Sequence, residues 1–415
     1  MNRVVITGMG VVSPVGNDVP SFWQSIKNGE CGIAPITKFD TSNFKVKVAG
    51  EVRDFDPRSC MEKLDVLHSD IYTQFAMSAA CQAAEESGVV GTVAPERMGV
   101  YIGTGIGGIA TFMTEHENLL ERGPRRVSPY FIPMMIANMA SAMIAMRFDC
   151  KGPAMPAVTA CASGTNAIGE AMRLIRHGYA DVMIAGGAEA TVNPLAAAGF
   201  STMKALSFSE DPLAASLPFD LRRSGFVMGE GAGALVLEEY EHAKARGAHI
   251  YAEVSGYGST CDAYHMTAPH PEAEGGARAI LDAWNETGLD TDNVYYNAHG
   301  TGTPMNDKAE TIAVKKALGE ERARRVSISS TKSMTGHMLG AAGAAEAIVS
   351  VLALTEGIAP PTIGLEVPDP ECDLDYTPGA AKRREFDVAL STSLGFGGHN
   401  ACLAFRKIGG GADER

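Results

Sequence analysis

The sequence predicts an α/β protein with mainly parallel, mixed sheets covered by helices. Short β-branched segments alternate with helix-like segments along the chain, which favours parallel strands joined by helices. The two halves of the chain also repeat one another weakly, in the same order. In addition, residues 341–354 form a helix-like run that is apolar almost all round apart from Glu346. Such a helix must be buried, and it suits a layer between two sheets.

The internal repeat pairs four segments of the first half with four of the second. Val4–Gly10 corresponds to Ala252–Gly258, Met98–Gly108 to Val294–Thr303, the helix after Cys161 to the helix after Lys332, and Asp181–Gly187 to Asp387–Gly398. The junction lies near 239–248. We therefore expect an N-terminal half at 1–245, a C-terminal half at 246–408 and a flexible tail at 409–415, which reads Gly-Gly-Gly-Ala-Asp-Glu-Arg.

Composition excludes several classes of protein. The 415 residues are 45% hydrophobic and carry a net charge of −14, which argues against general nucleic-acid binding. The eight cysteines form no CxxC pair, which favours reduced cytoplasmic thiols over a disulfide or zinc framework. We find neither a run of 18 apolar residues nor the long apolar region of a signal peptide. The expectation is a cytoplasmic protein with no membrane segment and no metal.

Cys161 is the strongest candidate nucleophile. An apolar stretch leads into it and a helix-like pattern leaves it, so it is expected on a turn at the start of a buried helix. Unpaired backbone N–H groups and the positive end of a helix stabilise a thiolate. A thiolate supports acyl transfer through a thioester. A buried structural cysteine is the alternative, and the commoner fate of a free thiol.

The candidate partners of Cys161 lie in the second half. His299 follows the strand-like run Val294–Tyr296 and precedes Gly-Thr-Gly-Thr. Lys332 and His337 come just before the apolar helix at 341–354. Each of these residues lies at a Gly-rich turn between a strand and a helix, which makes a shared site more plausible than isolated structural roles.

Four motifs occur in the order found in the β-ketoacyl-[acyl-carrier-protein] synthases. They are Thr-Ala-Cys-Ala-Ser-Gly at 159–164, His-Gly-Thr-Gly-Thr at 299–303, Thr-Lys-Ser-Met-Thr-Gly-His at 331–337 and Gly-Phe-Gly-Gly at 395–398. The chain resembles this family, and its type II enzyme of fatty-acid synthesis in particular, over nearly its whole length. The resemblance implies a thiolase-like five-layer αβαβα fold. It also implies a decarboxylative condensation of malonyl carrier protein with an acyl chain.

The resemblance assigns roles to particular residues. It implies a catalytic set of Cys161, His299 and His337, supported by Lys332, which Glu346 could pair with. Phe396 would complete the oxyanion hole and act as a gate, and Thr301 and Thr303 would bind the pantetheine arm. The candidates for the acyl pocket are Ile106, Phe131, Met135 and Phe200.

The resemblance also implies an acyl carrier protein as partner, a homodimer, and no cofactor beyond the phosphopantetheine on the carrier. Because this chain is itself acidic, an acidic carrier protein would need a local basic patch. The candidates are Lys63, Arg125, Arg126 and Lys204. The apolar segment beginning at Phe131 is expected to be an exposed loop that suits a dimer seam.

Four other functions are consistent with parts of the sequence. Gly103–Gly108 fits the GxGxxG pattern of dinucleotide-binding enzymes, but the expected acidic residue at the end of a second strand is absent. Non-catalytic partner subunits of polyketide systems lack the nucleophilic cysteine that this chain has. A thiolase would carry a second cysteine in the turn at 394–399, where there is none. A type II polyketide ketosynthase shares the Cys–His–His set and remains the alternative.

Overall fold

The computed structural model describes residues 1–408 of the chain, and the predicted tail at 409–415 lies outside them. Within the described residues, the main sheet has ten strands. Their order is β10 (Ser327–Ser329), β9 (Val294–Asn297), β13 (Val388–Gly395), β14 (His399–Arg406), β8 (Ala252–Cys261), β1 (Val4–Val12), β7 (Gly231–Glu239), β6 (Val182–Glu189), β4 (Met98–Gly103) and β5 (Ala154–Ala157).

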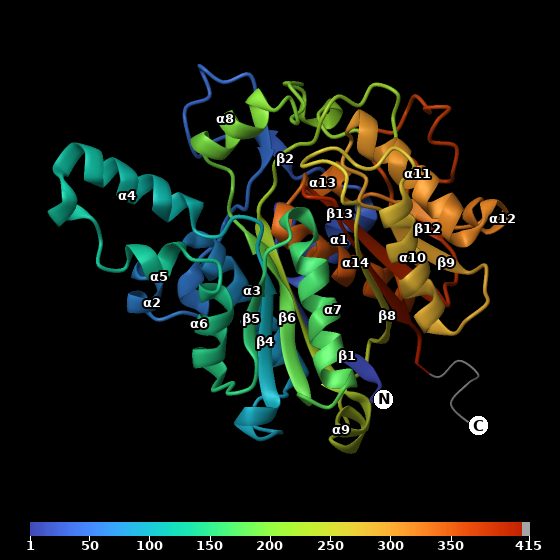
Figure 1. Cartoon of the computed structure of the whole chain (residues 1–415), viewed down its shortest axis with the longest axis horizontal. Coiled ribbons are helices and arrows are strands. Elements are labelled where there is room, and N and C mark those ends of the chain that lie inside the picture. The colour runs from blue at the N-terminus through green and yellow to red at the C-terminus, as the bar shows by residue number, and fades with distance from the viewer. Residues whose placement is uncertain (409–415) are drawn as a thin grey trace.

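The strand order confirms the predicted repeat. The two halves of the sheet meet where β1 pairs with β8, and the strands on either side follow the same order outward. Counted outward from this pair, β1 corresponds to β8, β6 to β13 and β4 to β9. These are the three strand correspondences expected from the sequence. Figure 1 shows the first half, from blue to green, beside the second half, from yellow to red.

The expectation of mainly parallel strands was wrong in detail. Four neighbouring pairs are parallel (β10–β9, β9–β13, β6–β4 and β4–β5). The other five are antiparallel. A hairpin of three residues joins β13 to β14, and so short a connection forces antiparallel pairing. Parallel pairing is confined to the outer strands of each half.

The helices form three layers around the two half-sheets, which confirms the five-layer prediction. In the described chain they are α1 (Val19–Asn28), α2 (Lys63–Leu67), α3 (Ile71–Ser87), α4 (Ile109–Arg122), α5 (Phe131–Met135), α6 (Met139–Phe148), α7 (Ser163–Arg176), α8 (Pro194–Thr202), α9 (Tyr240–Ala245), α10 (Glu274–Thr287), α11 (Pro304–Leu318), α12 (Glu320–Ala323), α13 (Lys332–Thr335) and α14 (Ala342–Glu356). Helices α3 and α6 cover the first half-sheet, and α10 and α11 cover the second. Helices α7 and α14 lie between the half-sheets.

The alternation of side chains along β7 explains the layering. Leu235 and Leu237 point into the central layer, whereas Ala234 and Val236 point toward α3. Both faces of the strand are therefore apolar and buried, as a sheet covered on both sides requires. Among residues 1–408, four further short strands form two small ladders, namely β2 (Ile33–Pro35) with β3 (Val48–Gly50), and β11 (Ile358–Ala359) with β12 (Lys382–Arg383).

The apolar helix predicted at 341–354 is α14, and residues 342–354 are buried throughout. Residues Leu339–Glu356 are long and apolar enough to cross a membrane by composition alone. However, 89% of that window is buried inside the protein, so the segment serves as a core helix.

The segment from Phe131 is not the loop expected from the sequence, because it forms α5 and then α6. Helix α4 projects from the body of the molecule beside α5 (Figure 1).

Candidate active site

Cys161 lies in a single 3-10 turn, Ala160–Ala162, immediately before α7. The Ser163 hydroxyl fixes this turn, because it accepts a hydrogen bond from the Thr159 N–H (2.9 Å) and donates one to the Ala160 carbonyl (2.7 Å). Ala160 takes a positive φ of 51°, which aids the sharp entry into the helix. The predicted position of Cys161, on a turn at the start of a buried helix, is confirmed.

The ionisation of Cys161 differs from the expectation. Burial raises the pKa of its thiol to about 12, although the positive charge of Lys332 opposes the rise. The backbone N–H groups of Phe396 and of Cys161 itself also favour the thiolate, but more weakly. Desolvation therefore outweighs the helix end and the lysine, and the resting residue is a neutral thiol.

His337 contacts Cys161 directly. Its Nε2 atom lies 3.0 Å from the Cys161 Sγ atom. Its Nδ1 atom accepts a hydrogen bond from the Leu339 N–H, at 3.3 Å. Because Nδ1 is an acceptor, the neutral ring must carry its proton on Nε2. His337 thus presents an N–H group to the sulfur and is a hydrogen-bond donor in the resting site.

His299 lies beside His337 at the end of β9. The centroids of the two imidazole rings are 5.3 Å apart and their planes are nearly perpendicular, at 84°. The carboxylate of Glu310, on α11, fixes the turn by accepting hydrogen bonds from the backbone N–H groups of His299 and Gly300, both at 2.7 Å. The buried Nδ1 atom of the His299 side chain has no hydrogen-bond partner among the described residues.

Lys332 supplies the positive charge of the site from within the protein. It lies at the start of α13, is 1% exposed and forms an ion pair with Glu346 of α14. Burial lowers the pKa of both His299 and His337 well below the usual value, and Lys332 lowers it further. The site therefore combines two neutral imidazoles with one fixed, paired cation.

Cys161, His299 and His337 meet at one cavity of about 610 Å³, which has a mainly apolar lining. The residues predicted from the sequence that line it are Cys161, His299, His337, Thr301, Thr303, Ile106, Phe200, Phe396 and Lys204. Phe226 and Leu339, which the sequence did not single out, also line it. Phe131 and Met135 are not part of this lining, because they lie on α5, where the Phe131 ring packs near Phe112 of α4.

Phe396 lies in the hairpin between β13 and β14, next to Cys161. A side chain at Gly395 would lie 2.8 Å from the Thr159 carbonyl oxygen, so a glycine is needed for the hairpin to approach the nucleophile turn this closely. Gly397 and Gly398 have positive φ angles of 85° and 76°. The half-buried Phe396 ring is thus carried by a hairpin made mostly of glycine.

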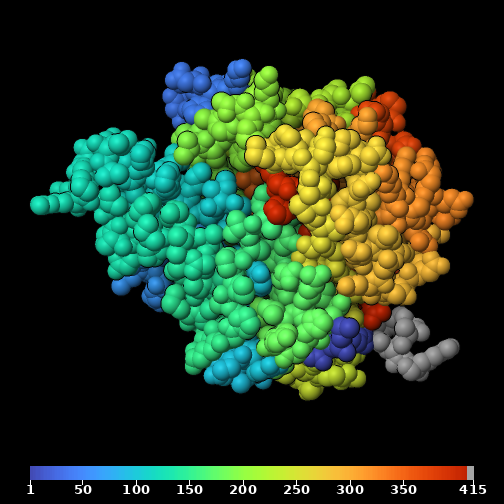
Figure 2. Space-filling model, in the orientation of Figure 1, coloured from blue at the N-terminus to red at the C-terminus, as the bar shows by residue number. Residues whose placement is uncertain are grey.

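The basic residues predicted to bind a partner are all exposed. Lys63 begins α2, and α2 is adjacent to the segment before α5, because the His68 and Tyr130 rings stack with centroids 3.7 Å apart. Arg125 and Arg126 lie in a turn that contacts α4. Lys204 follows α8 at the cavity entrance. In the space-filling view, a small red area from the C-terminal part of the chain is visible between the green and yellow segments (Figure 2).

Glu189 is a buried residue of the site that the sequence analysis missed. Its carboxylate, at the end of β6, accepts hydrogen bonds from the backbone N–H groups of Gly105 (2.6 Å), Ile106 (3.2 Å) and Gly340 (3.0 Å). It therefore connects the Gly-rich loop after β4 with the turn before α14. A protein carboxylate already bonds to the N–H groups that a phosphate would need, which removes the basis for the dinucleotide interpretation.

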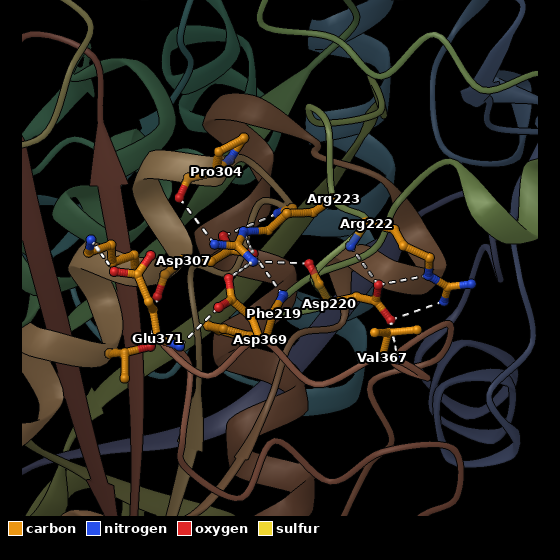
Figure 3. A network of polar contacts seen from close by, with 12 residues as sticks. Phe219, Asp220, Arg222, Arg223, Pro304, Asp307, Val367, Asp369 and Glu371 are labelled. Atoms are coloured by element: carbon orange, nitrogen blue, oxygen red, sulfur yellow. Dashed lines mark hydrogen bonds and ion pairs between the residues drawn. The ribbon is translucent and has the colours of Figure 1, made fainter.

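A second missed group supports the turn that carries Thr301 and Thr303, and Figure 3 shows its members Arg223, Asp307 and Asp369 close to Pro304. The buried Arg223 guanidinium donates hydrogen bonds to the carbonyl oxygens of Thr303 and Pro304, both at 3.2 Å, and pairs with Asp369 at 2.5 Å. Asp307 accepts a hydrogen bond from the Gly302 N–H at 3.2 Å. From the sequence, Arg223 is only a charged residue in a loop that contains glycine. Its role could not be predicted, because the residues that it contacts lie about 80 and 146 positions away in the sequence.

The comparisons with known proteins agree with this geometry. Residues 1–243 match the N-terminal domain model of β-ketoacyl synthases, and residues 251–366 match the C-terminal domain model. A 3-oxoacyl-[acyl-carrier-protein] synthase 2 from Synechocystis sp. is 52% identical over 408 residues, which cover 98% of each chain. The enzyme of the same name from Staphylococcus aureus is 49% identical over 98% of each chain.

Solved structures give the same result. A β-ketoacyl synthase from Burkholderia phymatum has a TM-score of 0.91 and 35% identity, over 98% of this chain and all of that one. A type II polyketide ketosynthase solved with its acyl carrier protein and a bound hexaketide has a TM-score of 0.89 and 36% identity, over 98% of this chain and 99% of that one. From its sequence, its five-layer architecture and these matches, the chain belongs to the β-ketoacyl synthase family.

Proposed function

We propose that this enzyme is a 3-oxoacyl-[acyl-carrier-protein] synthase of type II, which elongates fatty acids by condensing malonyl carrier protein with an acyl chain held on Cys161. The observation that carries the proposal is the pairing of the Cys161 sulfur with the His337 Nε2–H group at 3.0 Å, in an apolar cavity that also contains His299. A nucleophilic thiol and two neutral hydrogen-bond donors are the groups that this reaction requires.

In the first step, the Cys161 sulfur attacks the thioester carbonyl of an acyl carrier protein. The Nε2–H group of His337 stabilises negative charge on the sulfur as the thiol proton leaves for the departing pantetheine thiolate. The backbone N–H groups of Cys161 and Phe396 are aimed at the nucleophile and would stabilise the tetrahedral oxyanion. The product is an acyl thioester on Cys161.

In the second step, malonyl carrier protein enters and loses carbon dioxide. The pair of electrons from the broken bond moves onto the thioester carbonyl, where His299 and His337 donate hydrogen bonds to the enolate oxygen. Neutral imidazoles suit this role because they donate without first having to gain a proton. The carbanion then attacks the Cys161 thioester and releases a β-ketoacyl carrier protein two carbons longer. The electron pair for the new carbon–carbon bond comes from the bond that breaks when carbon dioxide leaves, so the step needs no redox cofactor.

We further propose an acyl carrier protein as the partner and a homodimer as the working form. The solved relative bound to its carrier protein supports the first, together with the exposed Lys63, Arg125, Arg126 and Lys204. Exposed apolar side chains around α4 to α6, including Leu120 (71%), Ile132 (55%) and Met146 (70%), support the second. The free cysteines of the described chain support a reducing, cytoplasmic location.

A ketosynthase of a type II polyketide system is the second candidate, because two solved structures that are each 36% identical to this chain support it. One is a type II polyketide ketosynthase bound to a hexaketide, and the other is the ishigamide ketosynthase with its chain-length factor. One incubation separates the two functions. A saturated acyl carrier protein and an excess of malonyl carrier protein are supplied without any reductase, and the products are identified by mass. A single extension to a β-ketoacyl carrier protein supports the fatty-acid enzyme. Repeated extension to a poly-β-keto chain supports the alternative, and absence of any condensation overturns both.

A further inference from the structure

A second cavity, of about 770 Å³, lies away from Cys161 against α3 and contains two thiols. Cys60 follows the turn Pro57–Ser59, and Cys81 lies on α3. Both are partly buried and both line the cavity. The residues of the cavity wall do not overlap with those of the condensing site, so this pair of thiols has no part in the mechanism above.

The two thiols lie near the same polar group, the hydroxyl of Ser78. The Cys60 Sγ atom lies 3.2 Å from the Ser78 Oγ atom. Ser78 and Cys81 are three residues apart on α3 and so share one face of that helix. The exposed guanidinium of Arg147, on α6, lines the same cavity and brings positive charge to the thiols. A small solute therefore meets a thiol, a second thiol and a cation together.

The ionisation of these thiols agrees with their surroundings. The neighbouring Cys81 thiol lowers the pKa of Cys60, against the effect of burial, and Ser78 and Arg147 lower it further. In contrast, burial raises the pKa of the thiols of Cys31, Cys150, Cys372 and Cys402. The thiolate form is therefore favoured at Cys60 and disfavoured at Cys81, and a thiolate beside a second thiol is the pairing that thiol–disulfide exchange requires.

We propose that Cys60 and Cys81 form a redox-sensitive modification site, which closes to a disulfide when a small organic disulfide reacts with it. The Cys60 thiolate attacks one sulfur of the small disulfide and releases one thiolate, leaving a mixed disulfide on Cys60. The Cys81 sulfur then attacks the Cys60 sulfur and releases the second thiol, which takes the Cys81 proton. The protein loses two electrons and the small disulfide gains them. The new disulfide bond links the turn that precedes α2, where Cys60 lies, with helix α3, where Cys81 lies.

Peptide mapping tests this directly in the full chain. The Cys161→Ala variant is incubated with glutathione disulfide, alkylated, and digested with trypsin without reduction. Cleavage after Arg58, Lys63 and Arg97 places Cys60 in the peptide 59–63 and Cys81 in the peptide 64–97. The expected result is a disulfide between these two peptides, lost on treatment with a reducing thiol. Recovery of the two peptides as separate alkylated species, or linkage of either to another cysteine, would overturn the proposal.

Two variants separate the steps of the exchange. In Cys81→Ser, Cys60 should stop at the mixed disulfide with glutathione, because the resolving thiol is missing. In Cys31→Ser, which removes a partly buried thiol outside this cavity, the linked peptides should form as in the parent. An alkylated Cys60 without glutathione in Cys81→Ser would contradict its role as the attacking thiol.

Discussion

Lys332 and Glu346 form an ion pair in which the two side chains are only 1% and 4% exposed. The charge that acts on Cys161 and on both histidines is therefore held inside the protein, and its counter-charge lies on the neighbouring helix α14. A buried pair of this kind is strongly destabilising to break, because the remaining charge is left without a partner.

We therefore expect Glu346→Gln to lower the free energy of unfolding by about 3–5 kcal/mol. The double variant Lys332→Met/Glu346→Gln should lose less than the single change, because neither charge is then left alone. Urea denaturation of the three proteins measures this. A double variant that loses as much stability as Glu346→Gln, or more, would show that the two side chains do not depend on one another.

His299→Ala and His337→Ala should each reduce malonyl decarboxylation about a hundredfold, because loss of one oxyanion donor costs about 3 kcal/mol. Some acyl transfer to Cys161 should survive in both variants. Release of labelled carbon dioxide from malonyl carrier protein measures the first effect, and acylation of the protein measures the second. Wild-type rates of carbon dioxide release in either variant would remove the histidines from this role.

The neutral histidines also predict how stability depends on pH. The pKa of His337 is depressed in the folded protein, so the unfolded chain binds more protons than the folded one once the pH falls below about 6.5. The contribution of His337 to stability is thus complete above that pH and lost as the pH falls. Between pH 7.5 and pH 5.5, the free energy of unfolding of the wild type should fall by about 1.4 kcal/mol more than that of His337→Gln. An identical pH dependence of unfolding in the two proteins would show that His337 titrates normally.

Phe396→Ala should change the order in which acyl and malonyl substrates are accepted. The ring lies on a Gly-rich hairpin beside Cys161, where it can block the cavity until the hairpin moves. Rapid-mixing kinetics with each substrate added first provide the measurement. If both substrates react in the variant as they do in the wild type, the ring is a static part of the turn.

Charge reversal at Lys63 and Arg126 should weaken the use of carrier-protein substrates about fivefold at low salt, with a smaller effect as salt is added. Small pantetheine thioesters should react as before, because neither residue lines the cavity. Arg383→Glu, an exposed change on β12, is the matched control. An equal loss with both kinds of substrate would place these residues in the fold and not in docking.

The features that could be predicted from the sequence are those with a local residue pattern that is typical of one structure or one kind of site. The apolar run of α14, the turns around Cys161, His299 and His337, and the paired segments of the two halves each have a local signature. The ionisation of Cys161 could not be predicted, because it depends on burial by segments from the whole chain. The supports provided by Glu189 and Arg223 were missed for the same reason, since both bond mainly to backbone groups far away in sequence.

The most direct test of the proposed function is the mass of the intact protein through one catalytic cycle. After incubation with an acyl carrier protein, the protein should gain one acyl group, and peptide mapping should place it on Cys161. Addition of malonyl carrier protein should then remove the group, with release of carbon dioxide and a product two carbons longer. Acylation of the Cys161→Ala variant to the same extent, or an adduct on Cys161 that malonyl carrier protein does not discharge, would contradict the account.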